Sequence, residues 1–187
     1  MTWALIIGGI VVVLLLVGVF LFNRVVRLRN EVNTGWSNID VQLKRRNDLI
    51  PNLVEAVKGY AAHERGVFEE VTAARATMAQ AATPAQAGVA DAQLGQALGR
   101  LFAVAEAYPD LKASQNFLQL QSDLTDTEDK IAAARRYYNA TVLAYNNAIQ
   151  TFPTLVFAGL FGFDAREFFS ADEGDRAPVA VSFQTQA

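Results

Sequence analysis

An uncharged apolar run opens the chain and predicts a membrane-spanning helix. No charged side chain occurs in residues 1–22, and Arg24, Arg27 and Arg29 follow directly. A helix needs about 20 apolar residues to cross a hydrocarbon layer about 30 Å thick, and this run has that length. A cleaved secretory signal would carry a basic residue before the apolar core and small residues at the cleavage point, whereas this run ends on bulky residues. We therefore expect an uncleaved anchor over residues 1–23 that includes Trp3, Leu5, Ile10, Leu15, Phe20 and Phe22.

After the anchor, apolar positions recur with helical spacing as far as residue 152, and no alternating strand pattern of useful length interrupts them. The first set keeps intervals of three and four residues: Val25, Leu28, Val32, Trp36, Ile39 and Leu43. Because this period continues that of the anchor, we expect one rod on the order of 70 Å long at 1.5 Å per residue. Pro51 then interrupts the pattern, which predicts a turn or sharp kink near residues 47–50.

Three more helices are expected. The second runs from Leu53 to about Gln80, the third covers Leu94 to Tyr108, and the fourth runs from Phe117 to Phe152, where Pro153 ends it. Thr83-Pro84 supplies a cap and a first-turn proline before the third helix. The sequence therefore predicts an all-α protein, in which an N-terminal transmembrane helix continues into an antiparallel four-helix bundle over residues 24–152.

A phenylalanine-rich amphipathic segment is expected over residues 153–170. Too short to span a bilayer, it should lie along the lipid interface, cap the end of the bundle or contact a neighbouring protomer. The candidate contact residues are Phe157, Phe161, Phe163, Phe168 and Phe169. Residues 171–187 form a polar tail that we expect to be mobile unless it meets a partner.

Charge and composition narrow the function classes. The formal net charge of −3 argues against nucleic acid as a partner, since its binders usually carry a positive surplus. The basic residues cluster beside the anchor, and by the positive-inside tendency this places the domain in the cytoplasm and the N-terminus outside. The chain has no cysteine, so disulfides and thiolate metal sites are excluded.

Charged residues occupy positions in the helical seams where apolar side chains are usual. A buried charge costs several kcal/mol unless it is paired, so these side chains should pair across the bundle in a polar layer. The alternative is that these rows of helical positions turn away from the core along each helix, which would leave the charged side chains half exposed. The candidate layer consists of Arg46, Glu64, Glu128 and Arg135.

No motif in the sequence predicts catalysis. His63 is the single histidine and has no glutamate three residues before it, which argues against a di-iron bundle. No Gly-x-Ser-x-Gly elbow and no phosphate-binding glycine loop occur in the soluble part. We therefore predict no catalytic residue, no metal ligand and no cofactor.

Residues 40–54 contain the densest mixture of charged, amide and bulky apolar side chains in the chain. Cations at the end of one helix and Asn or Asp at the start of the next satisfy the dipole and capping rules without any function. The functional alternative is an interaction surface on the expected turn, formed by Arg45, Arg46, Asn47, Asp48, Pro51 and Asn52.

The same region carries a family resemblance. The blocks Trp36–Arg46, Asp48–Val54 and Gly59–Glu64 resemble the LemA family of bacterial membrane proteins, although Asn47 stands where that family commonly has histidine. Later blocks also resemble it: Glu106–Ala113, Phe117–Gln121, Thr127-Glu128, Ala134–Asn139, Tyr145-Asn146 and Phe152-Pro153. The resemblance implies a single N-terminal anchor in the bacterial cytoplasmic (inner) membrane, a helical bundle, and a link to membrane organisation, including magnetosome formation. It implies no catalytic reaction and supplies no site residues.

Two functions remain in view from the sequence. The first is a non-enzymatic membrane-anchored scaffold that self-associates, because long helices with apolar seams and a phenylalanine-rich segment leave surface that a second copy can bury. The alternative is an adaptor or sensor that binds another membrane protein through the expected turn between the first two helices. The expected partners are the lipid bilayer, further copies of the chain and other membrane proteins.

Overall fold

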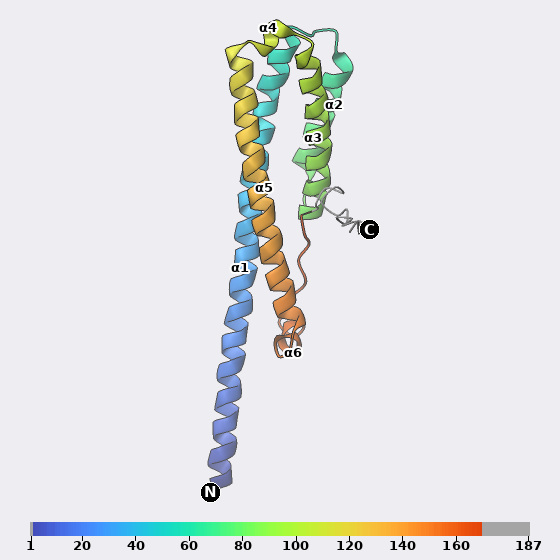
Figure 1. The fold of residues 1–187 in the computed structure, drawn as a ribbon. Coiled ribbons are helices and arrows are strands. Elements are labelled where there is room, and N and C mark those ends of the chain that lie inside the picture. The colour runs from blue at the N-terminus through green and yellow to red at the C-terminus, as the bar shows by residue number, and fades with distance from the viewer. Residues whose placement is uncertain (1, 170–187) are drawn as a thin grey trace, which may run out of the picture.

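The computed structural model describes residues 2–169, and every regular element in that range is a helix (Figure 1). The elements are α1 (Thr2–Lys58), α2 (Arg65–Gln80), α3 (Pro84–Glu106), α4 (Pro109–Lys112), α5 (Gln115–Gln150) and α6 (Thr154–Ala158). The predicted all-α class is confirmed, as is a long apolar helix at the N-terminus. The predicted tail of residues 171–187 lies outside the described residues.

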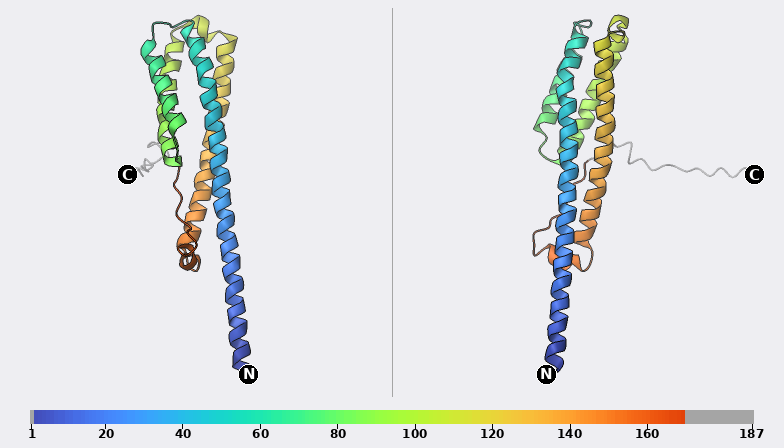
Figure 2. Two further views of the ribbon diagram at one scale, coloured as in Figure 1. Left: turned by 180° about the vertical axis from the view of Figure 1, so that it is seen from behind. Right: turned by 90° about the vertical axis from the view of Figure 1, so that its left-hand side faces the viewer.

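The long helices form two antiparallel pairs of unequal length. α1 packs along α5 in the most extensive interface of the chain, and α2 packs along α3. Figures 1 and 2 show the α2–α3 hairpin beside the end of the α1–α5 pair that is remote from the N-terminus. Among the helices, α1 and then α6 lie beside the lower part of α5. The four helices thus run together over part of the α1–α5 length, rather than over all of residues 24–152.

A glycine sets the close approach of α1 and α5. A Cβ added to Gly35 would lie 3.3 Å from the Cα of Tyr138 and 3.4 Å from Oγ1 of Thr141. Such distances are tight for a methyl group, so a larger residue would push the two helices apart. Gly35 therefore brings the rod and its partner helix into backbone contact.

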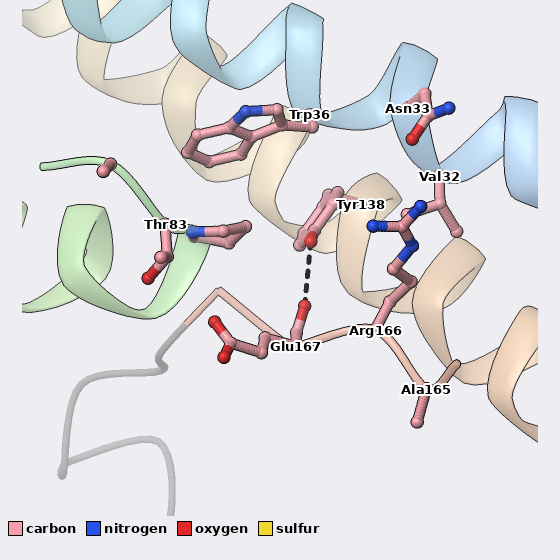
Figure 3. A pocket seen from close by; sticks show the side chains of 10 residues that line it. Val32, Asn33, Trp36, Thr83, Tyr138, Ala165, Arg166 and Glu167 are labelled. Atoms are coloured by element: carbon pink, nitrogen blue, oxygen red, sulfur yellow. Dashed lines mark hydrogen bonds between the residues drawn. The ribbon is translucent and has the colours of Figure 1, made fainter. Parts of the chain in front are cut away.

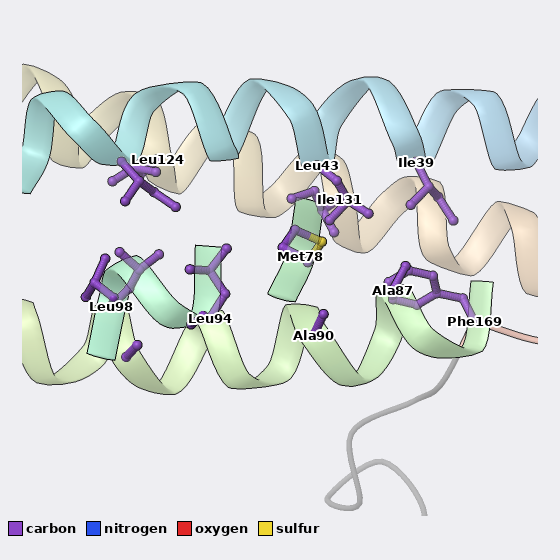
Figure 4. Close-up of a cluster of buried hydrophobic side chains, with 14 of the residues drawn as sticks. Ile39, Leu43, Met78, Ala87, Ala90, Leu94, Leu98, Leu124, Ile131 and Phe169 are labelled. Carbon is purple, nitrogen blue, oxygen red and sulfur yellow. The ribbon is translucent and has the colours of Figure 1, made fainter. Parts of the chain in front are cut away.

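The core lies between the two helix pairs, and Figure 4 shows its central part. Ile39 and Leu43 of α1, Leu94 of α3 and Ile131 of α5 meet there, and each is at most 6% exposed. Further buried members come from α2, α3, α5 and the C-terminal segment: Met78, Ala87, Ala90, Leu98, Leu124 and Phe169. This shared core stabilises the hairpin against the rod.

The predicted turn at residues 47–50 is wrong, because α1 continues through Pro51 to Lys58. Proline lacks the N–H that would reach the carbonyl of Asn47 four residues earlier. In this fold Nε of Arg75, from α2, donates to that carbonyl oxygen at 3.2 Å. The side chain thus satisfies the acceptor that Pro51 leaves open, and the helix passes the proline.

The predicted second helix ends at Gln80 as expected, but its predicted start at Leu53 is wrong, because α2 begins at Arg65. Residues 53–58 belong to α1, and the chain turns at residues 59–64, beginning with Gly59. Glycine is a poor helix former, and the amide of Ala61 closes the turn on the carbonyl of Val57 at 2.9 Å. The range predicted for one helix, from Leu53 to Gln80, therefore includes the end of α1, this turn and all of α2.

The third and fourth helices agree better with expectation. α3 begins at Pro84, earlier than predicted, and the hydroxyl of Thr83 accepts from the amide of Gln86 as the predicted cap. α5 extends from Gln115 to Gln150, within two residues of the predicted limits at both ends.

Candidate functional site

The first part of α1 projects beyond the rest of the chain (Figures 1 and 2). From Leu5 onward along α1, Leu21 is the first buried side chain, at 8% exposed. Within residues 2–169, α1 is the one helix long and apolar enough to cross a membrane, with a mean hydropathy of 3.2 in its most apolar window. The six predicted anchor residues are all exposed on this projecting end: Trp3, Leu5, Ile10, Leu15, Phe20 and Phe22.

The segment that follows α6 lies against the last turn of this apolar run. The ring of Phe22 stands 5.1 Å from that of Phe161 and 5.6 Å from that of Phe163, measured between centroids. The guanidinium of Arg29 lies 5.6 Å from the centre of the Phe163 ring, a cation–π contact that ties the same point to the next turns of α1. The end of the charge-free run and the phenylalanine-rich segment therefore meet.

Around this junction a set of large apolar side chains remains exposed, and we call it the apolar foot. Phe152 is 83% exposed and Leu160 79%, and the other members are each at least 38% exposed. The apolar foot consists of Phe152, Leu155, Val156, Phe157, Leu160 and Phe161.

The predicted contact phenylalanines divide into two groups. Phe157, Phe161 and Phe168 are exposed, as a lipid or protomer contact requires. Phe163 and Phe169 differ from that expectation, since they are 8% and 1% exposed and belong to the chain's own core. Phe163 packs against α1, and Phe169 returns to the core between the helix pairs.

After Phe163 the chain turns back along α5 as an extended strap, residues 164–169, which two asparagines of α5 hold by its main chain. Asn146 accepts from the amide of Arg166 at 2.8 Å and donates to its carbonyl at 2.9 Å. Asn139 does the same to Phe169, at 3.0 and 3.1 Å. Each side chain thus pairs with both main-chain groups of one residue, as a neighbouring strand would.

The strap closes one side of a groove between α1 and α5 (Figure 3). The hollow beside it has a volume of about 380 Å³, and the hydroxyl of Tyr138 donates to the carbonyl of Glu167 at 2.8 Å across its floor. Burial raises the pKa of the Tyr138 phenol, against the opposing effect of Arg166, so the donor keeps its proton. The groove is lined by Val32, Asn33, Trp36, Ala82, Thr83, Pro84, Tyr138, Ala165, Arg166 and Glu167.

A buried ion-pair cluster joins three helices in the upper part of the domain. Nη1 of Arg46 lies 2.6 Å from Oδ1 of Asp91 and 3.0 Å from Oε2 of Glu128. Arg46 is 4% exposed and Asp91 is 7% exposed, so the pair is shielded from water. This links α1 to α3 and α5 at a depth where an unpaired charge would be costly.

The structure brings two residues of the expected polar layer together, Arg46 and Glu128. A buried carboxylate from outside that set, Asp91, contacts the same guanidinium. Glu64 is instead exposed in the turn before α2, because the seam that placed it on a helix is broken there. Arg135 is half-buried, two turns further along α5.

The predicted interaction surface does not form one face. All six of its residues lie inside α1, where successive positions point around the helix. Arg46 is buried, Asn47 and Pro51 are half-buried, and the exposed members are Arg45, Asp48 and Asn52. Nη2 of Arg45 lies 3.9 Å from Oδ2 of Asp126, a loose contact between exposed side chains.

The described residues offer no obvious catalytic cluster. No group of three or more His, Asp or Glu side chains that could hold a metal ion occurs in residues 2–169. His63 is exposed in the turn between α1 and α2.

Comparison with known proteins covers the sequence blocks that resemble the LemA family. The LemA family model matches residues 35–183, which begin at the glycine where α1 meets α5. The chain belongs to the LemA family. Magnetosome protein MamQ of Magnetospirillum gryphiswaldense is 28% identical to it, over 84% of this chain and 68% of its own length. Protein LemA of Metamycoplasma hominis is 29% identical, over 90% of this chain and 80% of its own length.

In this LemA-family chain, some structural residues had a sequence signal and others had none. The pairs Tyr138-Asn139 and Tyr145-Asn146 repeat at a spacing of seven, which places both asparagines on one face of α5. That repeat could have identified the two asparagines that hold the strap, Asn139 and Asn146. Asp91 and Arg75 lacked such a signal, since their partners lie on other helices.

Proposed function

We propose that this LemA-family protein is a non-enzymatic membrane-anchored scaffold that self-associates and organises membrane or membrane-protein assemblies. The observation that carries the proposal is the continuity of α1 from its projecting apolar end through the domain to Lys58. A continuous helix transmits the pose of its spanning part to the domain, whereas a flexible tether would only localise it. A fixed pose favours side-by-side assembly of identical copies.

Exposed apolar side chains outside the foot support self-association. Val41 on α1 is 56% exposed, and Leu118 and Leu143 on α5 are 49% and 52% exposed. Association of copies that stand upright in one membrane would remove such side chains from water. The related MamQ is named a magnetosome protein, which agrees with a role in organising a membrane.

The proposed location is the bacterial cytoplasmic membrane, with the domain in the cytoplasm. Arg24 and Arg27 are exposed on α1 just beyond the apolar run, where cytoplasmic basic residues are expected. Because the chain has no cysteine, Asp48→Cys gives one exposed thiol on the domain. An impermeant thiol reagent should label it in inverted membrane vesicles and leave it unlabelled in intact spheroplasts. The reverse pattern would place the domain outside.

The decisive experiment for the scaffold is the mass of the full-length protein in detergent or lipid nanodiscs. Light scattering corrected for detergent and lipid should give a multiple of the 20.4 kDa chain mass. A strictly monomeric particle over the accessible concentration range would contradict self-association. The adaptor alternative depended on a turn at residues 47–50, and α1 passes through those residues as a helix.

A further inference from the structure

The apolar foot is placed at one particular level of the rod. Its ring contact is with Phe22, the last apolar residue before Asn23 and Arg24. From Trp3 to Phe22 the helix rises about 30 Å, which equals the thickness of the bilayer's hydrocarbon layer. If α1 spans the membrane, the foot therefore lies where hydrocarbon gives way to headgroups.

The charge distribution around the foot fits that boundary. No charged residue occurs from Tyr137 to Phe163, so the lower end of α5 and the whole of α6 are uncharged. Basic side chains are placed on the domain side of this level, with Arg24 and Arg27 exposed on α1. Exposed apolar side chains in the foot, with cations on its domain side, are typical of a segment that lies in the lipid–water interface.

We infer that the apolar foot inserts into the lipid interface beside the anchor and is a second attachment to the membrane. This inference rests on the membrane anchoring in the proposed function and adds a lipid-binding surface to it. A single spanning helix is free to tilt, on average by about 20°. A second contact at the side of α1 restrains that tilt and fixes the side from which the domain leaves the bilayer.

A spin label at Leu160 tests the inference, because this residue is 79% exposed and Leu160→Cys creates the only thiol. The full-length protein is placed in vesicles of phosphatidylcholine and phosphatidylglycerol. Access to oxygen, which enters lipid, is compared with access to a water-soluble nickel chelate. Two matched labels bracket the result: Leu15→Cys in the anchor, and Asn116→Cys, at an exposed polar residue in the first turn of α5 at the opposite end of the domain.

We expect the Leu160 label to resemble the Leu15 label, with oxygen favoured over the nickel chelate. A Leu160 label that resembles the Asn116 label would place the foot in water and overturn the inference. Shielding from both reagents would mean that a second copy covers the foot, which also overturns it. Failure of the anchoring itself is distinguishable, because the Leu15 label would then be open to the nickel chelate.

A variant separates insertion from simple proximity. Leu155→Glu with Leu160→Glu changes two exposed side chains, so the helix content measured by circular dichroism should be unchanged. A label at Phe152→Cys should then lose its preference for oxygen, because the two carboxylates lift the foot from lipid. An unchanged preference would contradict an inserted foot.

Discussion

Nε of Arg75 donates to the carbonyl oxygen of Asn47 at 3.2 Å, across the interface between α2 and α1. This is the carbonyl that a regular helix would pair with the amide of residue 51, and residue 51 is proline. A guanidinium from a helix that follows in the chain thus replaces the missing backbone donor. The contact couples the continuity of the rod to the docking of the α2–α3 hairpin.

Replacing Arg75 should weaken that coupling. Arg75→Met keeps most of the aliphatic stem but leaves the Asn47 carbonyl without its donor, and the loss of such a bond costs about 1–2 kcal/mol. We expect a lower thermal midpoint for the full-length protein in detergent, followed by circular dichroism. Arg65→Met, an exposed arginine at the start of the same helix, is the matched control and should have little effect.

A double-mutant cycle with Pro51→Ala gives the sharper test. Alanine restores the N–H at residue 51, so the Asn47 carbonyl regains a partner within α1. Arg75→Met should then cost less in the Pro51→Ala background than in the natural one. Equal costs in the two backgrounds would show that Arg75 acts through something other than this carbonyl.

The buried ion pair predicts a larger effect. Asp91→Asn removes the charge 2.6 Å from Nη1 of Arg46 and leaves that guanidinium with Glu128, whose side chain is 54% exposed. Breaking a buried pair by removing one partner costs about 3–5 kcal/mol, and the remaining pair places the expected loss near the lower limit. The measurement is the free energy of unfolding of the detergent-solubilised protein in denaturant.

The control for Asp91 is an ion pair on the surface. Glu70→Gln breaks the contact with Arg100, whose side chain is 65% exposed, and should cost at most about 1 kcal/mol. If Asp91→Asn lowered the free energy of unfolding no more than Glu70→Gln does, the buried pair with Arg46 would contribute no more to stability than a surface ion pair.

These residues show why the sequence predicted some features and not others. The 36-residue α5 was predicted closely because its apolar spacing is uninterrupted and prolines lie beyond both ends. The break between α1 and α2 was displaced because Pro51 normally marks a boundary, and the compensating Arg75 is distant in sequence. The rule that proline ends a helix considers only neighbouring residues, so it could not include a hydrogen-bond donor that the tertiary fold brings from α2.

The candidate site divides in the same way. The anchor follows from composition alone, and of the six residues of the apolar foot only Phe157 and Phe161 were among the expected contact residues. Phe163 and Phe169 have the same local composition, but Phe163 packs against Phe22 of α1, and Phe169 reaches the core because the strap folds back along α5. That path depends on main-chain bonds to Asn139 and Asn146, which hydrophobic periodicity does not reveal.

The strap gives a local prediction. Asn146→Ala removes both hydrogen bonds to the main chain of Arg166 and should loosen the strap by about 1–3 kcal/mol while the helices remain folded. Faster hydrogen exchange of the Arg166 amide is the expected result, with the core of α5 unchanged. Asn147→Ala, the exposed neighbour, is the control. Equal exchange in the two variants would mean that Asn146 does not hold the strap.

High pH should release the strap at its middle. The Tyr138 phenol donates to the carbonyl of Glu167, and burial raises its pKa above the ordinary value of 10.0. A raised pKa in the folded state means that the fold binds this proton more tightly than the unfolded chain does. The resulting stabilisation is complete below about pH 10 and is lost as the pH rises through the higher folded pKa, because a phenolate cannot donate. Proteolysis of the strap by an alkali-tolerant protease should therefore accelerate in that range. Tyr138→Phe, which lacks the hydroxyl, should show faster cleavage at neutral pH and lose the alkaline step, and a step of unchanged size in that variant would assign the effect to another group.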